Sequence, residues 1–128
     1  MKPFLLKVEK PWGYELIFTQ ANSLVTGKIL HLNAGTRFSL QYHDRKEETL
    51  VLLNGKALLI LQDSEKNQEE ISMEPQKGYL LKPLQIHRVK ALTDCDILEV
   101  STIEVGNTIR LEDDYARGTE TEEDRKNR

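Results

Sequence analysis

Short strand-like segments interrupted by turn signals are the feature that most limits the fold of this chain. Before residue 105, no stretch of ten or more residues repeats its apolar side chains with a helical period. Short runs of apolar and β-branched residues end in Gly, Pro, Asn or Asp about every ten residues, as in a β-sandwich or β-barrel. Asn54-Gly55 is the strongest of these signals and predicts a hairpin. The sequence therefore predicts an all-β domain.

The charge and hydropathy of the chain exclude two classes of partner. The net charge is −3 and no block of basic residues is present, so we expect no nucleic acid as partner. The longest apolar run has five residues, far fewer than the roughly 20 that a bilayer requires, so we expect no membrane span. The N-terminus lacks a secretory signal, which predicts a cytoplasmic protein. The single Cys95 cannot form an internal disulfide and is expected on a strand as a small buried residue.

The extent of the domain follows from where apolar residues stop. We expect one domain over residues 1–117, with an N-terminal arm before residue 10. From Gly118 to Arg128 the chain has no apolar residue, which predicts a disordered, charged tail over residues 118–128. Leu50 to Leu53 is apolar on both strand faces. Together with the N-terminal arm, this segment predicts a homodimer.

The stretch from Ser39 to Gly55 combines several side chains that can bind a metal ion. If residues 37–43 form a strand, then Arg37, Ser39, Gln41 and His43 share one face, because strand side chains alternate. A hairpin turn of about four to five residues would bring Glu48 back beside His43, and the later His87 could complete the cluster. Two imidazoles, one carboxylate and one amide oxygen can hold a divalent ion. We expect the bound ion to be zinc, with manganese, iron, cobalt or nickel as alternatives.

Two further polar residues lie within the strand expected from Leu24 to Leu32. Lys28 is either a solvated lysine on an outer face or a cation that points into a pocket, and its position leaves both interpretations open. His31 belongs to no ligand pattern and is interpreted as an ordinary histidine on a strand face.

The residues around the predicted ligands resemble the first motif of the cupins, which are double-stranded β-helix or jelly-roll barrels. The motif runs from Gly35 through five residues to Gln41-Tyr42-His43, then four residues to Glu48 and six to Gly55. Gln41 replaces the first histidine of the usual pair. The second cupin motif is represented by residues 82–87, in which the proline is shifted by one position and the glycine is lost. The resemblance implies that Gln41, His43, Glu48 and His87 are metal ligands.

Three segments narrow the resemblance to one branch of the cupins. The string SLQYH, residues 39–43, is similar to the SLQxH signature of phosphomannose isomerases. KPWGYE, residues 10–15, and RLEDDYAR, residues 110–117, resemble the opening and closing segments of the type II mannose-6-phosphate isomerase domain. In many members that domain follows a sugar-nucleotide pyrophosphorylase domain. We expect no guanylyltransferase activity from the present sequence.

This resemblance implies a metal-dependent aldose-ketose isomerase of a phosphorylated sugar. A metal ion would polarise the sugar oxygens while a general base moves a proton between C1 and C2. Lys28, Arg37 and Arg117 are expected to bind substrate or take part in catalysis, and Ser39 is expected to contact the substrate. The base is left open among Lys28, Glu47 and Lys82.

Two other functions are compatible with the same residues. His43, Glu48 and His87 could form the face of two histidines and one carboxylate that Fe(II) dioxygenases use. Alternatively, the barrel could bind a sugar or another metabolite without catalysis. All three interpretations imply a small-molecule ligand.

Overall fold

Eleven strands and one short helix make up the part of the chain that the computed structural model describes, residues 1–103 and 105–126. The strands are β1 (Leu6–Lys10), β2 (Gly13–Ile17), β3 (Val25–Leu32), β4 (Leu40–His43), β5 (Glu48–Asn54), β6 (Ala57–Gln62), β7 (Gln68–Ser72), β8 (Gly78–Leu81), β9 (Ile86–Ala91), β10 (Cys95–Thr102) and β11 (Thr108–Glu112). The helix is α1 (Glu122–Lys126). Within the described residues, no helix has the length and apolar character needed to cross a membrane.

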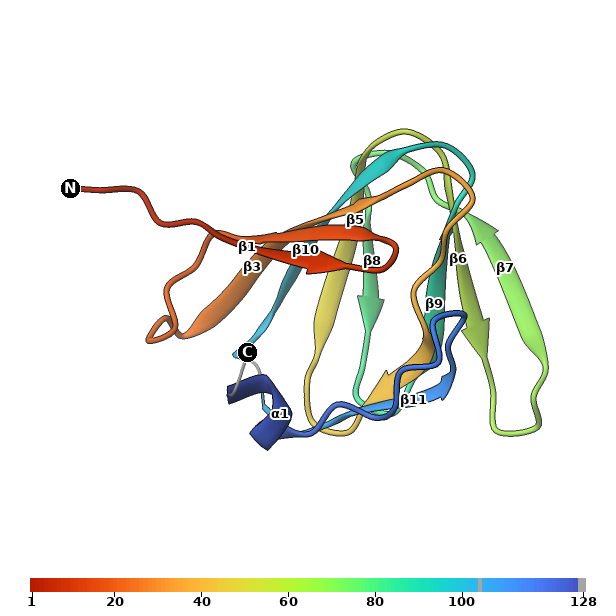
Figure 1. The fold of residues 1–128 in the computed structure, drawn as a ribbon. Helices are drawn as coiled ribbons and strands as arrows, with labels where there is room; N and C mark the ends of the chain where they lie inside the picture. Colours follow the sequence, from red (N-terminus) through yellow and green to blue (C-terminus); the bar gives the residue numbers. More distant parts are fainter. Residues whose placement is uncertain (104, 127–128) are drawn as a thin grey trace.

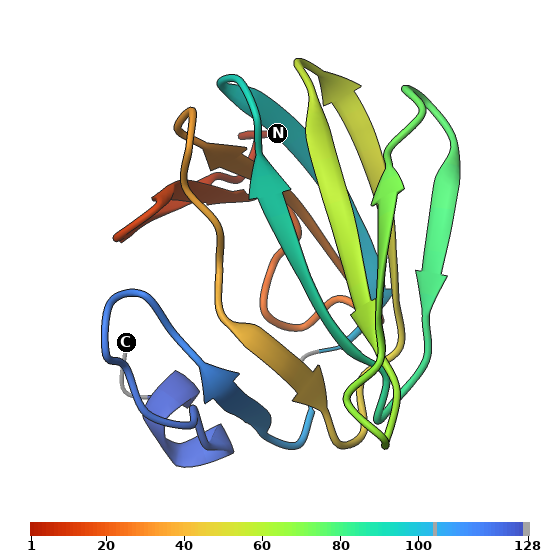
Figure 2. The ribbon, with the colours of Figure 1, turned by 90° about the vertical axis from the view of Figure 1, so that its right-hand side faces the viewer.

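The strands form two antiparallel sheets that face each other (Figures 1 and 2). One sheet has the order β1-β2-β3-β10-β5-β8, and the other has the order β11-β4-β9-β6-β7. Consecutive strands often lie in different sheets, as in a jelly roll. The all-β jelly-roll prediction is confirmed.

Two predicted hairpins are wrong in their pairing. Neither β4 with β5 nor β5 with β6 forms a ladder, because each pair is divided between the two sheets. Gly55 has a φ of 80°, and a side chain there would collide with the carbonyl of Asp94. Asn54-Gly55 is thus a tight turn that carries the chain across the sandwich. Local turn chemistry predicted the turn but not the sheet that the following strand joins.

The interior between the sheets has an apolar end and a charged end. Strands β3, β5 and β10 alternate, with every second side chain pointing inward. At one end these inward residues are Leu32, Leu52 and Ile97, which are at most 1% exposed. At the other end the same strands place Lys28, Glu48 and Glu99 inside, all of them buried. Because buried charges need partners, this end is where a functional site is expected.

The C-terminal segment differs from the predicted disordered tail. Residues 118–126, which we call the strap, follow β11 and end in α1 beside the charged end of the sandwich (Figure 1). The Gly106 amide donates a 2.6 Å hydrogen bond to Glu122, and Arg125 donates a 3.0 Å hydrogen bond to the Gly106 carbonyl. Polar contacts therefore order a segment that has no apolar residue. Residues 127–128 of the predicted tail lie outside the described residues.

Candidate metal centre

Three predicted ligands meet at the charged end of the sandwich. His43 ends β4, Glu48 begins β5 and His87 lies in β9, so both sheets contribute. Glu48 Oε1 lies 3.4 Å from His43 Nε2 and 3.1 Å from His87 Nε2. The ligand atoms of the three residues lie within 4.8 Å of one another. The short crossing from β4 to β5 thus brings Glu48 beside His43, as predicted, although the two residues belong to opposite sheets.

The imidazoles of His43 and His87 are oriented by hydrogen bonds on the side away from Glu48. His87 Nδ1 lies 2.9 Å from the Gln85 carbonyl oxygen, which can only accept, so this nitrogen carries the proton. His43 Nδ1 lies 3.1 Å from the Thr108 hydroxyl, which accepts a hydrogen bond when this nitrogen carries the proton. The two Nε2 atoms then present lone pairs to the centre of the cluster. Holding the second ring nitrogen in this manner is how proteins orient histidine ligands to metals.

Three buried atoms of this cluster lack a hydrogen bond. His43 Nε2, His87 Nε2 and Glu48 Oε2 have no hydrogen-bond partner in the part of the chain that the structure describes. His87 is 1% and Glu48 is 3% exposed, so bulk water does not compensate. Buried polar atoms are normally satisfied, and two imidazole lone pairs facing a carboxylate are complementary to a divalent cation. The residues therefore fit the metal ion that the sequence predicts.

The ionisation of this cluster also suits a cation. Burial raises the pKa of the Glu48 carboxyl group, but the Lys46 ammonium and the two imidazoles outweigh it and hold this pKa well below the usual range. Burial lowers the pKa of His43, and the nearby charge of Lys46 adds to this effect against the opposing influence of Glu48. A carboxylate and a neutral imidazole are the forms that bind a metal.

Gln41 lies next to the cluster. It is opposite His87 in the pairing of β4 with β9, and it lines the cavity beside the cluster. The buried Ser39 hydroxyl donates a 2.6 Å hydrogen bond to Gln41 Oε1. Ser39 thus holds the Gln41 side chain in place and is not itself among the residues that line the cavity.

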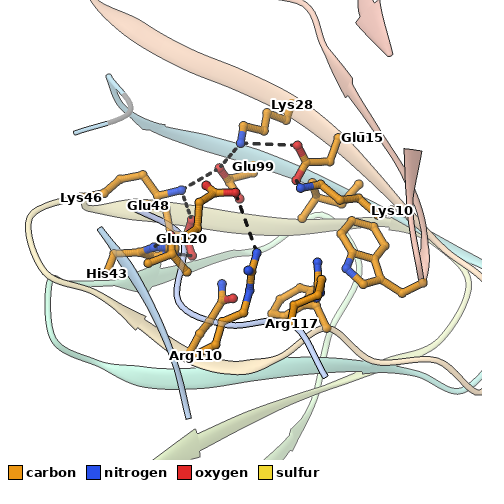
Figure 3. A pocket seen from close by; sticks show the side chains of 15 residues that line it. Lys10, Glu15, Lys28, His43, Lys46, Glu48, Glu99, Arg110, Arg117 and Glu120 are labelled. Carbon is orange, nitrogen blue, oxygen red and sulfur yellow. Dashed lines mark hydrogen bonds and ion pairs between the residues drawn. The ribbon is translucent and has the colours of Figure 1, made fainter. Parts of the chain in front are cut away.

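The cavity beside the ligands is small and lined mostly by charged side chains. Its volume is about 60 Å³. Alternating charges cross its sheet side in a continuous series, which Figure 3 shows as linked dashed lines. Lys46 lies 3.3 Å from Glu48 and 3.4 Å from Glu99, and Lys28 lies 4.0 Å from Glu99 and 3.7 Å from Glu15. The series begins at Glu48, one of the predicted ligands, and extends away from it.

Cations also line the side of the cavity that faces the C-terminal segment. Arg110 of β11 and Arg117 of the following loop both contribute (Figure 3). Arg117 donates 2.9 and 3.2 Å hydrogen bonds to the two carboxylate oxygens of Asp113. Lys28 and Arg117, two of the predicted substrate cations, therefore line the same cavity as the ligands.

Arg37, the third predicted cation, lies elsewhere. Strand β4 begins only at Leu40, so the alternation expected from residue 37 does not hold, and Arg37 does not share the face of His43. Its guanidinium donates hydrogen bonds of 2.8 and 2.9 Å to Asp114, and it is not among the residues that line the cavity.

Two of the three possible bases, Glu47 and Lys82, are exposed and also lie outside this lining. His31 stacks on Tyr14 and pairs with Asp96 at 2.7 Å, away from the cavity.

Several lining residues were not predicted from the sequence. Glu99 could have been found, because it interrupts the apolar inward face that Cys95 and Ile97 begin. Lys46 lies in the crossing between β4 and β5 and had no periodic signal. The other unpredicted charged residues of the lining are Lys10, Glu15, Arg110 and Glu120.

The structure is similar to solved structures of cupin-fold proteins. CapF from Staphylococcus aureus, a capsular polysaccharide assembling protein, has 15% identity and a TM-score of 0.64, with 94% of this chain and 33% of CapF covered. Lactobacillus farciminis oxalate decarboxylase in a formate complex has 17% identity and a TM-score of 0.68, with 84% and 34% covered. A cupin superfamily protein from Desulfitobacterium hafniense has 16% identity and a TM-score of 0.59, with 70% and 76% covered. The chain thus spans about a third of CapF and of the decarboxylase.

At these identities the structural likeness shows the cupin fold alone. No curated protein matches the chain in sequence. The family described as mannose-6-phosphate isomerase C-terminal matches residues 3–120, which covers all four predicted ligands and both lining arginines. The chain therefore belongs to the mannose-6-phosphate isomerase C-terminal family of cupins.

Proposed function

We propose that this chain is a metal-dependent aldose-ketose isomerase of a phosphorylated sugar, acting as a cytoplasmic homodimer. The observation that carries the proposal is the pair of buried Nε2 atoms of His43 and His87, which face the Glu48 carboxylate and have no hydrogen-bond partner among the described residues. A cavity with both carboxylates and cations lies directly beside them. Family membership supports mannose 6-phosphate and fructose 6-phosphate as the first pair to test.

The chain supplies ligands and proton-transfer groups for this reaction. His43, Glu48 and His87, with Gln41 beside them, would hold a divalent ion that polarises the carbonyl and hydroxyl oxygens of the sugar. Moving a proton between C1 and C2 needs a side chain within hydrogen-bond reach of the substrate. Of the three bases considered from the sequence, Lys28 alone lines the cavity. Glu99 also lines the cavity, and Lys46 contacts both Glu99 and the predicted ligand Glu48. We therefore assign the general base to Glu99 or Lys28.

The phosphate of the substrate requires cations on the opposite side of the cavity. Arg117 stays assigned to this role. Arg37 is paired with Asp114 outside the cavity, so we replace it in the proposal by Arg110.

Metal analysis combined with turnover tests the proposal. The purified chain should bind about one divalent ion per protomer and interconvert the two hexose phosphates, followed by NMR of the sugar carbons. His87→Ala should lose both properties, because a three-residue cluster is left with one imidazole and one carboxylate. His31→Ala is the matched control and should keep both, since His31 contacts Tyr14 and Asp96 instead. Metal binding without turnover of any sugar phosphate would indicate a binding protein without catalytic activity. Oxygen uptake in the presence of Fe(II) would indicate a dioxygenase.

The homodimer is proposed through the outer face of the six-stranded sheet. Leu16, Ile29, Leu98 and Val51 lie directly opposite one another across β2, β3, β10 and β5, and they form an apolar row on that face. Leu80 on the edge strand β8 is 54% exposed. Sedimentation of the wild-type chain should give a dimer mass, and Leu80→Asp should shift the equilibrium toward monomer. A monomer at micromolar concentration would contradict this assembly.

A further inference from the structure

Glu120 of the strap occupies the cationic side of the cavity. Its carboxylate lies 3.9 Å from Arg110 and 3.4 Å from Arg125, and it lines the same cavity as the candidate metal ligands. Figure 3 shows this side chain among the cavity residues, with a dashed line to Arg110. The backbone of Glu120 exchanges hydrogen bonds of 2.8 and 2.9 Å with Thr108 of β11. The strap therefore holds a carboxylate inside the site, through this bridge and through the hydrogen bonds of Glu122 and Arg125 with Gly106.

The Arg110 guanidinium is only partly satisfied by hydrogen bonds among the described residues. Its Nε is buried and has no hydrogen-bond partner within residues 1–103 and 105–126, while its Nη1 donates a 2.7 Å bond to the Gly118 carbonyl. Burial lowers the pKa of Arg110, and the neighbouring charge of Arg117 lowers it further. Two arginines that repel each other around a cavity create a site where an anion is stabilised.

The cationic side of the cavity is already occupied by a carboxylate. Glu120 lies 3.9 Å from Arg110 and lines the same cavity. An anion that binds Arg110 from the cavity must therefore compete with this carboxylate. Glu15, Glu48 and Glu99 line the cavity from strands β2, β5 and β10, whereas Glu120 lies in the strap, beyond the last strand. Among these four carboxylates, Glu120 is the one whose displacement breaks no ladder between two named strands.

We infer that Arg110 and Arg117 form a subsite for a phosphomonoester or inorganic phosphate, and that Glu120 fills this subsite until the anion displaces it together with the strap. The identification of the anion as the phosphate of a sugar rests on the proposed function; the subsite itself rests on the contacts above. A phosphate dianion offers more charge and more acceptors than one carboxylate and can accept paired N–H groups from arginine. Displacement would break the Thr108–Glu120 bridge and enlarge the cavity at the same time.

Calorimetric titration with inorganic phosphate tests the inference without any turnover. The full chain is first dialysed against EDTA, so that no metal ion competes for the anion, and is titrated at low ionic strength. Glu120→Gln should tighten phosphate binding about threefold, because a neutral amide competes less than a carboxylate for the cation of Arg110. Arg110→Gln should weaken it at least about tenfold, because a charge-assisted hydrogen bond is lost. Glu123→Gln changes the same charge at an exposed position of α1 and should have no effect.

Amide hydrogen exchange reports on the strap itself. Saturating phosphate should accelerate exchange of the Thr108 and Glu120 amides in the wild-type chain, whereas exchange in β9 should stay unchanged. Arg117→Gln serves as a second variant if Arg110→Gln fails to fold, and it should also weaken phosphate binding.

The possible outcomes separate this inference from the proposed function. Equal phosphate affinity in the wild type and Glu120→Gln, or protected strap amides at saturation, would show that Glu120 does not fill the subsite. Absence of phosphate binding in both proteins would remove the subsite altogether. If phosphate binds as expected but no sugar phosphate is isomerised, the subsite stands and the isomerase proposal fails. If isomerisation is observed and Arg110→Gln leaves its KM unchanged, the isomerase stands and the subsite fails.

Discussion

Lys46 is the residue whose removal should most clearly test the electrostatics of the cavity. It is 5% exposed, and its ammonium lies 3.3 Å from Glu48 and 3.4 Å from Glu99. At an effective dielectric constant of about 20, each contact corresponds to about 5 kcal/mol of Coulomb attraction before desolvation. Desolvation cancels much of this attraction in the intact pair. Loss of Lys46 alone, however, removes the ammonium beside the buried Glu48 and one of the cations beside Glu99, and breaking a buried pair in this way typically costs about 3–5 kcal/mol.

We therefore expect Lys46→Met to lower the free energy of unfolding of the metal-free chain by about 3–5 kcal/mol at pH 7. Urea unfolding followed by the fluorescence of Trp12, which is buried in the core, measures this difference. The loss should shrink as the pH falls, because without Lys46 burial raises the pKa of Glu48 and the carboxyl group becomes neutral by protonation.

Lys90→Met is the control for the loss of a positive charge. Lys90 is exposed on β9, and its replacement should change the unfolding free energy by no more than about 0.5 kcal/mol. If Lys46→Met costs less than about 1 kcal/mol, the contacts behave like a surface ion pair, and the assignment of a buried, strongly coupled site would be refuted.

Three further predictions concern single groups. Glu99→Gln should reduce kcat by about 10²-fold or more while metal content stays unchanged, if this carboxylate is the base; unchanged kcat would assign the role to another group. Burial raises the pKa of the Cys95 thiol to about 11, so a thiol reagent should react with the native chain at pH 7–8 only at the rate of unfolding, and rapid labelling would contradict this. The metal-free chain should lose stability on acidification. The pKa of His43 lies below its usual 6.5 in the folded state, so the unfolded state takes up a proton first as the pH falls. The low pKa of Glu48 in the folded state adds stability above about pH 4.5, and this stability disappears as the pH falls through that low pKa. Urea midpoints that do not fall between pH 7 and pH 4 would disagree.

The parts of the site that depend on local spacing could be predicted from the sequence. His43 and Glu48 are separated by four residues, and any short connection between two strands brings them together, whether it stays in one sheet or crosses to the other. His87 was included only as a later histidine that could complete the cluster, because local spacing does not place it. It lies near His43 because β9 pairs with β4. Long-range strand order cannot be read from one sequence.

The residues that sequence patterns missed depend on irregular segments. Arg37 was expected to face inward because alternation was extended through residues 37–39, but the strand starts at Leu40. Glu120 belongs to a segment without apolar residues, which composition alone predicts to be disordered. Its order comes from backbone bonds to Thr108 and from polar contacts with Gly106, and such contacts leave no periodic pattern.

The charged end of the sandwich also bears on how the strands find their alignment. A strand with apolar residues on both faces could slip by one residue and still bury a hydrophobic set, so hydrophobicity specifies its register weakly. Strands β3, β5 and β10 are of this kind, because Ile29, Val51 and Leu98 face outward. Lys28 and Glu99 are directly opposite each other in the pairing of β3 with β10, and a slip by one residue would place Lys28 opposite Leu98 or Val100 instead. The pair thus selects one alignment, and we expect the double variant Lys28→Met, Glu99→Leu to show multiple amide resonances where the wild type shows a single set.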